Sequence, residues 1–331
     1  MEDNRAESVE QIRLRLFSWW ERNARDLPWR FGRTTPWGVL VSEVMSQQTQ
    51  MSRVVPYWTD WMETWPDAAS LAGAGKAEVI TAWGRLGYPR RALRLRECAK
   101  VVSGEYDDRL PRTYQELVDL PGIGDYTASA VMSFAHGERI AVIDTNIRRV
   151  LSRVFLGIES LGGSTTSAER ELARSVLPED DPQARSSGGT GDGGLVGRLG
   201  GADEQARPTA WREPASAEWN QGLMELGATV CTARKPACRI CPLADHCRFL
   251  EAGLPDLGMK RTRPRQRFAG TNRQVRGKIL QALRQSEKGR ISRVRVEEVC
   301  QDRIQLDLCI ASLDEDGLLV IGKDGSLKLP E

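Results

Sequence analysis

Residues 120–130 read Leu-Pro-Gly-Ile-Gly-Asp-Tyr-Thr-Ala-Ser-Ala and separate two segments of helical character. Gly122 and Gly124 let the backbone turn tightly at the point where the second helix begins. The free N–H groups of its first turn, together with the helix dipole, can bind a phosphate. Contacts of this kind position a protein on DNA without reading its sequence. The alternative is an ordinary turn between two antiparallel helices.

Helical periodicity extends on both sides of this turn, from about residue 8 to residue 180. Apolar residues recur at helical spacing at Ile12, Leu16 and Trp20, and again within 37–57 and 77–102. No period-2 alternation interrupts the pattern, so we expect an all-α fold here. Eight of the ten tryptophans precede residue 84. We expect most of them to fill a helical core, because each buries a large apolar area.

Composition excludes several classes of protein. The chain has 331 residues, of which 40 % are hydrophobic and 28 % charged, which is typical of a globular protein of about two domains. It contains no apolar run long enough to span a membrane, and its acidic N-terminus lacks the pattern of a secretory signal. We therefore expect a cytoplasmic protein. The net charge of +2 gives no overall basic field, although local patches can still bind nucleic acid.

Four of the seven cysteines lie close together, with the spacing C-x6-C-x2-C-x5-C; they are Cys231, Cys238, Cys241 and Cys247. An odd total without a secretory signal argues against a disulfide framework. Four thiolates at this spacing can hold one metal centre, either zinc or a [4Fe–4S] cluster. Structural zinc sites usually show two C-x2-C pairs, and only one is present here.

Two acidic residues have the surroundings of catalytic groups. Asp144 follows an apolar run and precedes a helix, where a capping carboxylate is held rigid by backbone N–H donors, which also favour its ionised form. Glu43 lies between Val41 and Val44 on a helix whose apolar face is buried, and burial would keep its carboxyl group protonated, as a general acid requires. The alternatives are a purely structural cap at Asp144 and a surface position for Glu43.

The C-terminal part changes in character. Residues 186–201 are half glycine, so we expect a disordered insertion near 183–214, and a GxGxxG match inside it lacks the strand that a dinucleotide site needs. Eight Lys/Arg and no acid fall within 260–278, which predicts either a solvated linker or phosphate contact. Helical patterns follow at 272–286, 292–301 and 304–315.

The last residues predict a β-hairpin. Leucine, valine and isoleucine positions within 318–329 flank the turn residues Asp324 and Gly325. Three helices followed by a hairpin suggest a small winged-helix-like module.

Six motifs in a fixed order resemble the helix–hairpin–helix DNA glycosylases that carry an iron–sulfur cluster, and within that group the adenine DNA glycosylases of the MutY family. The resemblance covers about residues 8–250 apart from the glycine-rich insertion. It rests on the turn at 120–130, on the four cysteines, and on the motifs RDLPWR (25–30), SEVMSQQTQ (42–50), GRLGY (84–88) and IDTNIRRVL (143–151).

The resemblance implies a bilobal, all-α helix–hairpin–helix glycosylase fold with a [4Fe–4S] cluster loop, followed here by the winged-helix-like module. Residues 30–140 would form a six-helix barrel that includes the helix–hairpin–helix. Residues 8–29 and 141–250 would form the iron–sulfur cluster domain, with 251–271 as a basic linker and 272–331 as the module.

The resemblance also implies an activity: removal of adenine mispaired with 8-oxoguanine or guanine in double-stranded DNA, after the base has left the helical stack. Glu43 matches the acid that protonates adenine N7 and later activates water. Asp144 matches the carboxylate that stabilises the oxocarbenium ion, so that two carboxyl groups work in two protonation states. Tyr126 and Asn146 match residues that support this pair. The four cysteines match the cluster ligands.

Other family positions concern DNA. The adenine pocket would be lined by Trp29, Arg30 and Gln221. Gln48 and Tyr88 would enter the duplex beside the base opposite the adenine. Thr49 and Leu86 would lie near that base. Gly122 and Gly124 would present backbone N–H groups to a phosphate.

Three alternatives remain open on the sequence. Glycosylases that also cleave the strand carry a lysine where Tyr126 stands, and tyrosine cannot form their Schiff base, which favours a monofunctional enzyme. Thymine-mismatch glycosylases share this tyrosine. A non-catalytic DNA-binding iron–sulfur protein would not need Glu43 and Asp144. We expect a nucleoid-associated monomer, and the absence of a match to the Nudix-like domain of many relatives leaves its preference for 8-oxoguanine open.

Overall fold

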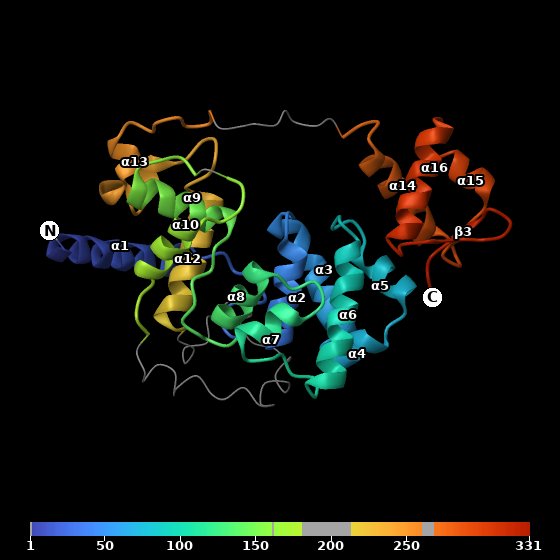
Figure 1. The fold of residues 1–331 in the computed structure, drawn as a ribbon, viewed down its shortest axis with the longest axis horizontal. Helices are drawn as coiled ribbons and strands as arrows, with labels where there is room; N and C mark the ends of the chain where they lie inside the picture. The colour runs from blue at the N-terminus through green and yellow to red at the C-terminus, as the bar shows by residue number, and fades with distance from the viewer. Residues whose placement is uncertain (1, 161, 181–212, 260–267) are drawn as a thin grey trace. The chain divides into compact units, whose positions relative to one another are not determined.

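The computed structural model describes residues 2–160, 162–180, 213–259 and 268–331, and these are mostly helical (Figure 1). Most of the glycine-rich insertion expected near 183–214, and residues 260–267 of the linker expected at 251–271, lie outside the described residues. The chain forms two compact units, the first made from 1–39, 112–118 and 124–262, and the second from 40–111, 119–123 and 263–331. The domain boundaries drawn from the sequence stay a prediction.

The first unit is built around one long central helix, α12, against which α1 and α9 pack. Its apolar core includes Leu16, Ile147, Val150, Trp219 and Leu223, all at most 1 % exposed. The helical segments of this unit are α1 (Glu2–Asn23), α8 (Asp125–Phe134), α9 (Thr145–Leu151), the π-helical turn η1 (Ser152–Leu156), α10 (Ser167–Ser175), α12 (Ala215–Thr229), the 3-10 turns η2 (Cys238–Ile240) and η3 (Ala244–His246), and α13 (Arg248–Glu251).

Two glycines let the neighbours of α12 come close. A Cβ atom at Gly222 would lie 3.2 Å from Cγ of Leu16 on α1. A Cβ atom at Gly227 would lie 2.6 Å from Cβ of Asn146 on α9, which is closer than real Cβ contacts come. The absence of side chains at these two positions therefore fixes how near α1 and α9 can approach α12.

The second unit holds the helices that follow α1 and precede the 120–130 turn. They are α2 (Pro36–Ser46, which begins in the first unit), α3 (Met51–Thr64), α4 (Ala68–Gly73), α5 (Lys76–Trp83), α6 (Arg90–Glu105) and α7 (Tyr114–Asp119, shared between the units). Trp61 packs edge-on against Trp65 and Trp83, with ring centroids 4.9 and 5.5 Å apart. All three rings are buried, which confirms that these tryptophans fill a helical core.

The C-terminal module has the winged-helix-like arrangement expected from the sequence. It contains α14 (Asn272–Gln285), β1 (Arg290–Ile291), α15 (Arg293–Glu297), α16 (Arg303–Glu315), β2 (Val320–Ile321) and β3 (Leu327–Lys328). The strands form one antiparallel sheet in the order β1-β3-β2. The sequence did not predict β1, because two residues are too few to show alternation, and α15 is shorter than the helix expected at 292–301.

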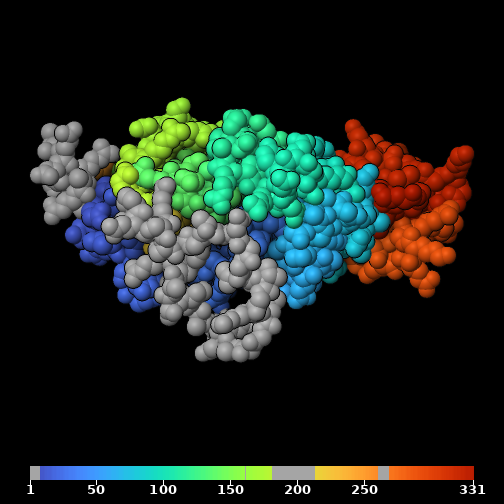
Figure 2. All heavy atoms as spheres, turned by 90° about the horizontal axis from the view of Figure 1, so that it is seen from below, coloured from blue at the N-terminus to red at the C-terminus, as the bar shows by residue number. Residues whose placement is uncertain are grey.

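The module packs on the helices of the same unit. Ile80 of α5 is fully buried within the apolar cluster that also contains Ile279 and Leu283 of α14. Arg284 of α14 donates from Nε to the carbonyl of Ile80 (3.0 Å) and from Nη1 to that of Gly84 (2.5 Å). In Figure 2 atoms of the module, in orange and red, lie directly against those of the α5 region. The module is therefore joined to the second unit by both apolar and polar contacts.

No helix among the described residues is both long enough and apolar enough to cross a membrane.

Leu283→Ala should lower the free energy of unfolding by about 2–5 kcal/mol, because a fully buried side chain leaves a cavity. The matched control is Leu308→Ala on α16, which is 60 % exposed in the wild type and should change stability by less than about 0.5 kcal/mol. Urea denaturation of both variants measures the difference. Equal effects would contradict the described core of the module.

Candidate active site and cysteine centre

Asp144 is the N-cap residue of α9. Its Oδ1 accepts from the backbone N–H of Ile147 (2.6 Å), and its Oδ2 accepts from Nδ2 of Asn146 (2.7 Å). Burial raises the pKa of Asp144 above its ordinary value, and these two hydrogen bonds lower it by less than burial raises it. The carboxyl group is therefore rigidly oriented, as the sequence predicted, but burial opposes its ionisation.

Arg149, one turn further along α9, connects this cap to the cysteine loop. Its Nη2 donates to Oδ1 of Asn146 (2.8 Å) and to the carbonyl of Gly227 (2.6 Å), and its Nε donates to the carbonyl of Cys231 (2.7 Å). The chain Asp144–Asn146–Arg149–Cys231 is thus continuous in hydrogen bonds. The position of the Asp144 carboxylate depends on the loop that holds the first cysteine.

Glu43 lies near the end of α2 in the second unit and is only 7 % exposed. Its neighbours in the sequence of the same helix, Val41, Val44 and Met45, are also buried. The structure therefore bears out the expected burial of this carboxyl group. Asp144 belongs to the first unit.

Arg91, on α6, holds the end of α2. Its Nη1 donates to the carbonyls of Val44 and Gln47, each at 2.7 Å, and its Nη2 donates to the carbonyl of Gly87 (3.2 Å). Burial lowers the pKa of Arg91 to about 10. A cation at a helix C-terminus is also favoured by the helix dipole. This one guanidinium ties the helix of Glu43 to the loop before α6.

The residues expected near the opposite base gather around Arg91. Thr49 Oγ1 donates to the carbonyl of Leu86 (3.3 Å) and accepts from Arg91 (3.4 Å), whereas the side chain of Leu86 is buried. Gln48 and Tyr88 are both exposed and have φ angles of 56° and 47°, a region that residues other than glycine rarely adopt. Such strain is common at binding sites.

The residues expected in the adenine pocket differ in what they contact. Arg30 is buried, and its Nη2 donates to Oε2 of Glu225 (2.8 Å), while its guanidinium lies 4.8 Å from the ring centroid of Trp20. Trp29 is half-buried. Gln221, on α12, is buried and donates from Nε2 to Glu213 (2.9 Å), but its Oε1 accepts from none of the described residues.

The turn at 120–130 has the conformation expected of it. Gly122 has φ of 82°, and a Cβ there would lie 2.9 Å from Cβ of Arg94. Gly124 is the N-cap of α8, and its carbonyl accepts from the N–H of Ala128 (2.9 Å). Tyr126 lies in the first turn of α8 and packs against the core of the first unit. The start of α8 therefore has the form of a phosphate-binding helix end.

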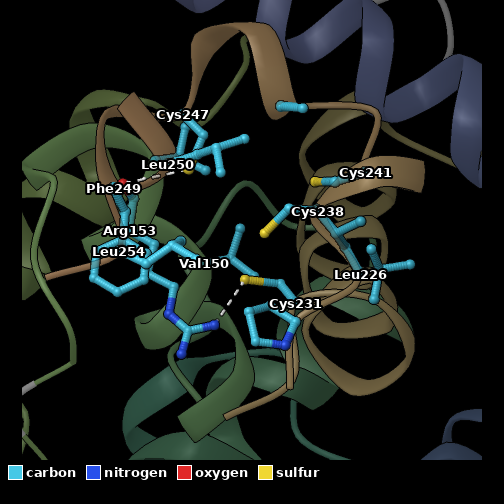
Figure 3. Close-up of a pocket in the computed structure, with 14 residues that line it drawn as sticks. Val150, Arg153, Leu226, Cys231, Cys238, Cys241, Cys247, Phe249, Leu250 and Leu254 are labelled. Atoms are coloured by element: carbon cyan, nitrogen blue, oxygen red, sulfur yellow. Dashed lines mark hydrogen bonds between the residues drawn. The ribbon is translucent and has the colours of Figure 1, made fainter. Parts of the chain in front are cut away.

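The four cysteines line one cavity in the first unit. Figure 3 shows them around a common space whose other walls are mainly apolar. All four are free thiols. Burial raises the pKa of Cys241 to about 12 and also raises those of Cys238 and Cys247. Four sulfur donors that line one space fit an iron–sulfur cluster, which would bind them as thiolates.

Arg153 stabilises the wall of this cavity. Its Nη1 donates to Sγ of Cys231 (3.4 Å) and to the carbonyl of Thr232 (2.9 Å), and its Nη2 pairs with Glu159 (2.7 Å). Its guanidinium also lies 5.0 Å from the ring centroid of Phe249. A buried arginine that contacts the first cysteine loop from several sides keeps that loop in one conformation.

The sequence analysis did not assign roles to Arg91, Arg149 and Arg153. Each donates mainly to backbone carbonyls that lie far away in the sequence or beyond a turn. Such acceptors leave no side-chain signature. The sequence gives only an indirect indication. In IDTNIRRVL the two arginines lie between apolar residues of a helix, which indicates that at least one guanidinium is buried and hydrogen-bonded to buried acceptors.

Comparisons with known families agree with this geometry. Residues 41–178 match the model of the HhH-GPD superfamily base excision DNA repair proteins. Residues 231–247 match the model of the iron–sulfur binding domain of endonuclease III. Residues 231–247, the segment that carries the four cysteines of the cavity, therefore form an iron–sulfur binding domain of a family that carries a [4Fe–4S] cluster.

Curated relatives cover most of the chain. An adenine DNA glycosylase of Mycolicibacterium smegmatis is 44 % identical over 96 % of this chain and 95 % of its own length. An adenine DNA glycosylase of Homo sapiens is 38 % identical over 72 % of this chain and 39 % of its own length. A thymine-DNA glycosylase of Aeropyrum pernix is 33 % identical over 72 % of this chain and 94 % of its own.

Solved structures support the fold. The chain resembles a thermostable thymine-DNA glycosylase with a TM-score of 0.59 at 24 % identity, covering 75 % of this chain and 98 % of that one. It resembles endonuclease III in a non-covalent DNA complex with a TM-score of 0.54 at 19 % identity, covering 74 % and 98 %. These likenesses establish the helix–hairpin–helix glycosylase architecture.

Cys238→Ser should remove the visible absorbance of the cluster and most of the bound iron, because one of four thiolate ligands is lost. Cys98→Ser is the control, since Cys98 is buried in the second unit and is not part of the cavity. Absorbance spectra and iron content of both purified variants decide the matter. Bound zinc without iron in the wild-type protein would show that the centre is a zinc site.

Proposed function

This chain belongs to the adenine DNA glycosylase family of base excision repair enzymes, and we propose that it removes adenine mispaired with 8-oxoguanine or guanine in double-stranded DNA. The observation that carries the proposal is that the similarity to an adenine DNA glycosylase extends over 96 % of the chain, which includes most of the C-terminal module. The reaction is hydrolysis of the N-glycosidic bond of a nucleotide that has left the stack.

Glu43 is proposed as the general acid. Its carboxyl group is buried, and burial in general favours the uncharged form of a carboxyl group. A protonated carboxyl group at this position can deliver a proton to adenine N7 and make the base a better leaving group. After the bond breaks, the resulting carboxylate can take a proton from the attacking water. The same residue then serves in both halves of the reaction.

Asp144 is proposed to stabilise the oxocarbenium ion. A partly desolvated carboxylate attracts a developing cation more strongly than an exposed one, because the local dielectric constant is low. The hydrogen bonds from Asn146 and Ile147 fix the direction in which it points. Such preorganisation requires no rearrangement during the reaction.

Gln221 supports adenine as the base. Its buried Oε1 receives no hydrogen bond from the described residues and can accept one from an amino group. Adenine offers such a donor at N6, whereas thymine offers a carbonyl at the corresponding edge. Removing the donor would leave a buried oxygen unsatisfied, which costs about 1–3 kcal/mol.

The [4Fe–4S] cluster would be held by Cys231, Cys238, Cys241 and Cys247, and when bound it supplies a rigid anchor for the loop between them. Arg234, Lys235 and Arg239 are exposed on this loop. Their charges suit the DNA backbone, where contacts position the protein without reading sequence. The glycine turn before α8 offers backbone N–H groups for the same purpose.

The remaining features follow from the same assignment. Tyr126 has no amine to form a Schiff base, so the enzyme is proposed to be monofunctional and to leave the strand intact. One chain supplies both carboxylates, so a monomer suffices. Its substrate would place it at the nucleoid.

The decisive experiment is single-turnover cleavage of labelled duplexes with adenine opposite 8-oxoguanine, guanine or thymine, and with thymine opposite guanine. We expect adenine loss opposite 8-oxoguanine and guanine, with strand breaks only after alkali. Thymine loss instead would favour a thymine-mismatch activity, in line with the name of the similar thymine-DNA glycosylase of Aeropyrum pernix. Breaks without alkali would contradict the monofunctional assignment.

Glu43→Gln is the matched control for that experiment, since the amide keeps the shape but cannot donate the carboxyl proton. It should lose at least about a hundredfold in the rate of excision while binding the mispair as before. Retained turnover would remove Glu43 from its role as the acid.

Asn146→Leu should shift the acidic side of the pH–rate profile to higher pH. Asp144 must be ionised to stabilise the cation, and the hydrogen bond from Asn146 lowers its pKa. Removing that bond raises the pKa further, so activity is lost at a higher pH as the solution is acidified. Single-turnover rates across the pH range test this. A shift of the alkaline side alone would assign the coupling to another group.

A further inference from the structure

The loop between α5 and α6, residues 84–89, is held by the C-terminal module. We call it the wedge loop because it carries Tyr88. Arg284 of α14 donates to the carbonyls of Ile80 and Gly84, at the end of α5, and Arg85 donates to Oε1 of Gln281 on α14 (3.3 Å). Arg90 at the other end of the loop pairs with Asp316, just after α16 (3.1 Å). Both ends of the loop therefore contact the module.

The Tyr88 ring lies near arginines of two helices, α6 and, from the C-terminal module, α14. The guanidinium of Arg273, on α14, is 5.1 Å from its centroid, and that of Arg91, on α6, is 5.6 Å away. Tyr88 remains 47 % exposed. Its backbone is in the left-handed region, so its conformation is held by these surroundings rather than by local preference.

A second aromatic residue lies next to Arg273. Phe268 is 57 % exposed, and its ring centroid is 6.0 Å from the Arg273 guanidinium. Exposed aromatic rings with an arginine between them are the components of platforms on which nucleobases stack. Neither ring is needed to fill a core, since both leave much of their surface to solvent.

The helix that would read DNA in a winged-helix protein is unsuited to that task here. Exposed apolar residues occupy α16, with Ile304 76 % and Leu308 60 % exposed. Its Arg303 is paired with Glu297, and its Asp307 accepts from Arg293. The basic and aromatic side chains instead gather at the start of α14, beside the wedge loop.

We infer that α14 of the C-terminal module holds the wedge loop in its inserting conformation, and that Arg273 is the positioning residue for Tyr88. This inference rests on the proposed function, in which Tyr88 enters the duplex beside the base opposite the adenine. The module then takes part in recognising the mispair through the wedge loop. Its partner is the unstacked step of a mispaired DNA duplex.

The test measures binding without turnover. The duplex carries 8-oxoguanine opposite a 2′-fluoro-deoxyadenosine, whose fluorine destabilises the oxocarbenium ion and stops excision, and 2-aminopurine beside the 8-oxoguanine reports unstacking by its fluorescence. Arg273→Gln in the full-length holoenzyme should weaken binding about two- to fivefold, the range of a cation–π contact near the surface, and reduce the fluorescence rise. Arg273→Lys should keep most of both signals.

A double-mutant cycle separates positioning from charge. In a Tyr88→Ala background, Arg273→Gln should weaken binding no more than Lys278→Gln does, because the ring that it positions is gone and only the general effect of one charge remains. Lys278→Gln is the matched control, an exposed cation on the same helix without a ring contact among the described residues. It should lower affinity only through general charge, equally in both backgrounds, and leave the fluorescence rise unchanged.

Three results would overturn the inference: wild-type affinity and fluorescence in Arg273→Gln, an equal loss in the Tyr88→Ala background, or the same loss of fluorescence in Lys278→Gln. The excision assay on unmodified duplexes distinguishes this failure from that of the proposed function. If the wild type excises adenine but the cycle shows no coupling, only the role of Arg273 is wrong. If no duplex loses adenine, the proposed function fails.

Discussion

The close approach of α12 to α9 is the constraint on which the candidate site depends. Only glycine fits at position 227, where a Cβ atom would overlap that of Asn146. This proximity lets Arg149 donate to the carbonyls of both Gly227 and Cys231 while it also holds Asn146, which in turn holds Asp144. The carboxylate and the cysteine loop are therefore positioned by one packing contact, and neither can be placed independently of it.

Buried arginines perform a task that the apolar core cannot. Arg30, Arg91, Arg149 and Arg153 are desolvated to different degrees, and each directs several donors at carboxylates or at carbonyls of loops. A guanidinium presents five N–H groups in a fixed plane, so it can hold several loop acceptors at once. Since loops lack the regular hydrogen bonds of helices, this is how irregular segments around the two carboxylates are kept in place.

The sequence predicted those features that have a local signature. The glycine turn before α8, the cap at Asp144, the burial of Glu43 and the Asp-Gly hairpin each depend on residues a few positions apart. The spacing of the cysteines identified the cluster loop. The sequence alone could not predict β1, which forms a strand only because β3 pairs with it. It also could not predict the roles of Arg91 and Arg149, because their hydrogen-bond acceptors are carbonyls distant in the sequence. These depend on tertiary contacts that leave no periodicity and no motif.

Arg91 has a consequence for how the protein searches DNA. The same guanidinium binds the carbonyls that end the helix of Glu43 and the carbonyl of Gly87 beside Tyr88. The helix that carries Glu43 and the wedge loop are thus joined through one guanidinium. An enzyme that tests many normal base pairs for each lesion benefits from this, because conformational entropy lost once on folding does not have to be lost again at every encounter.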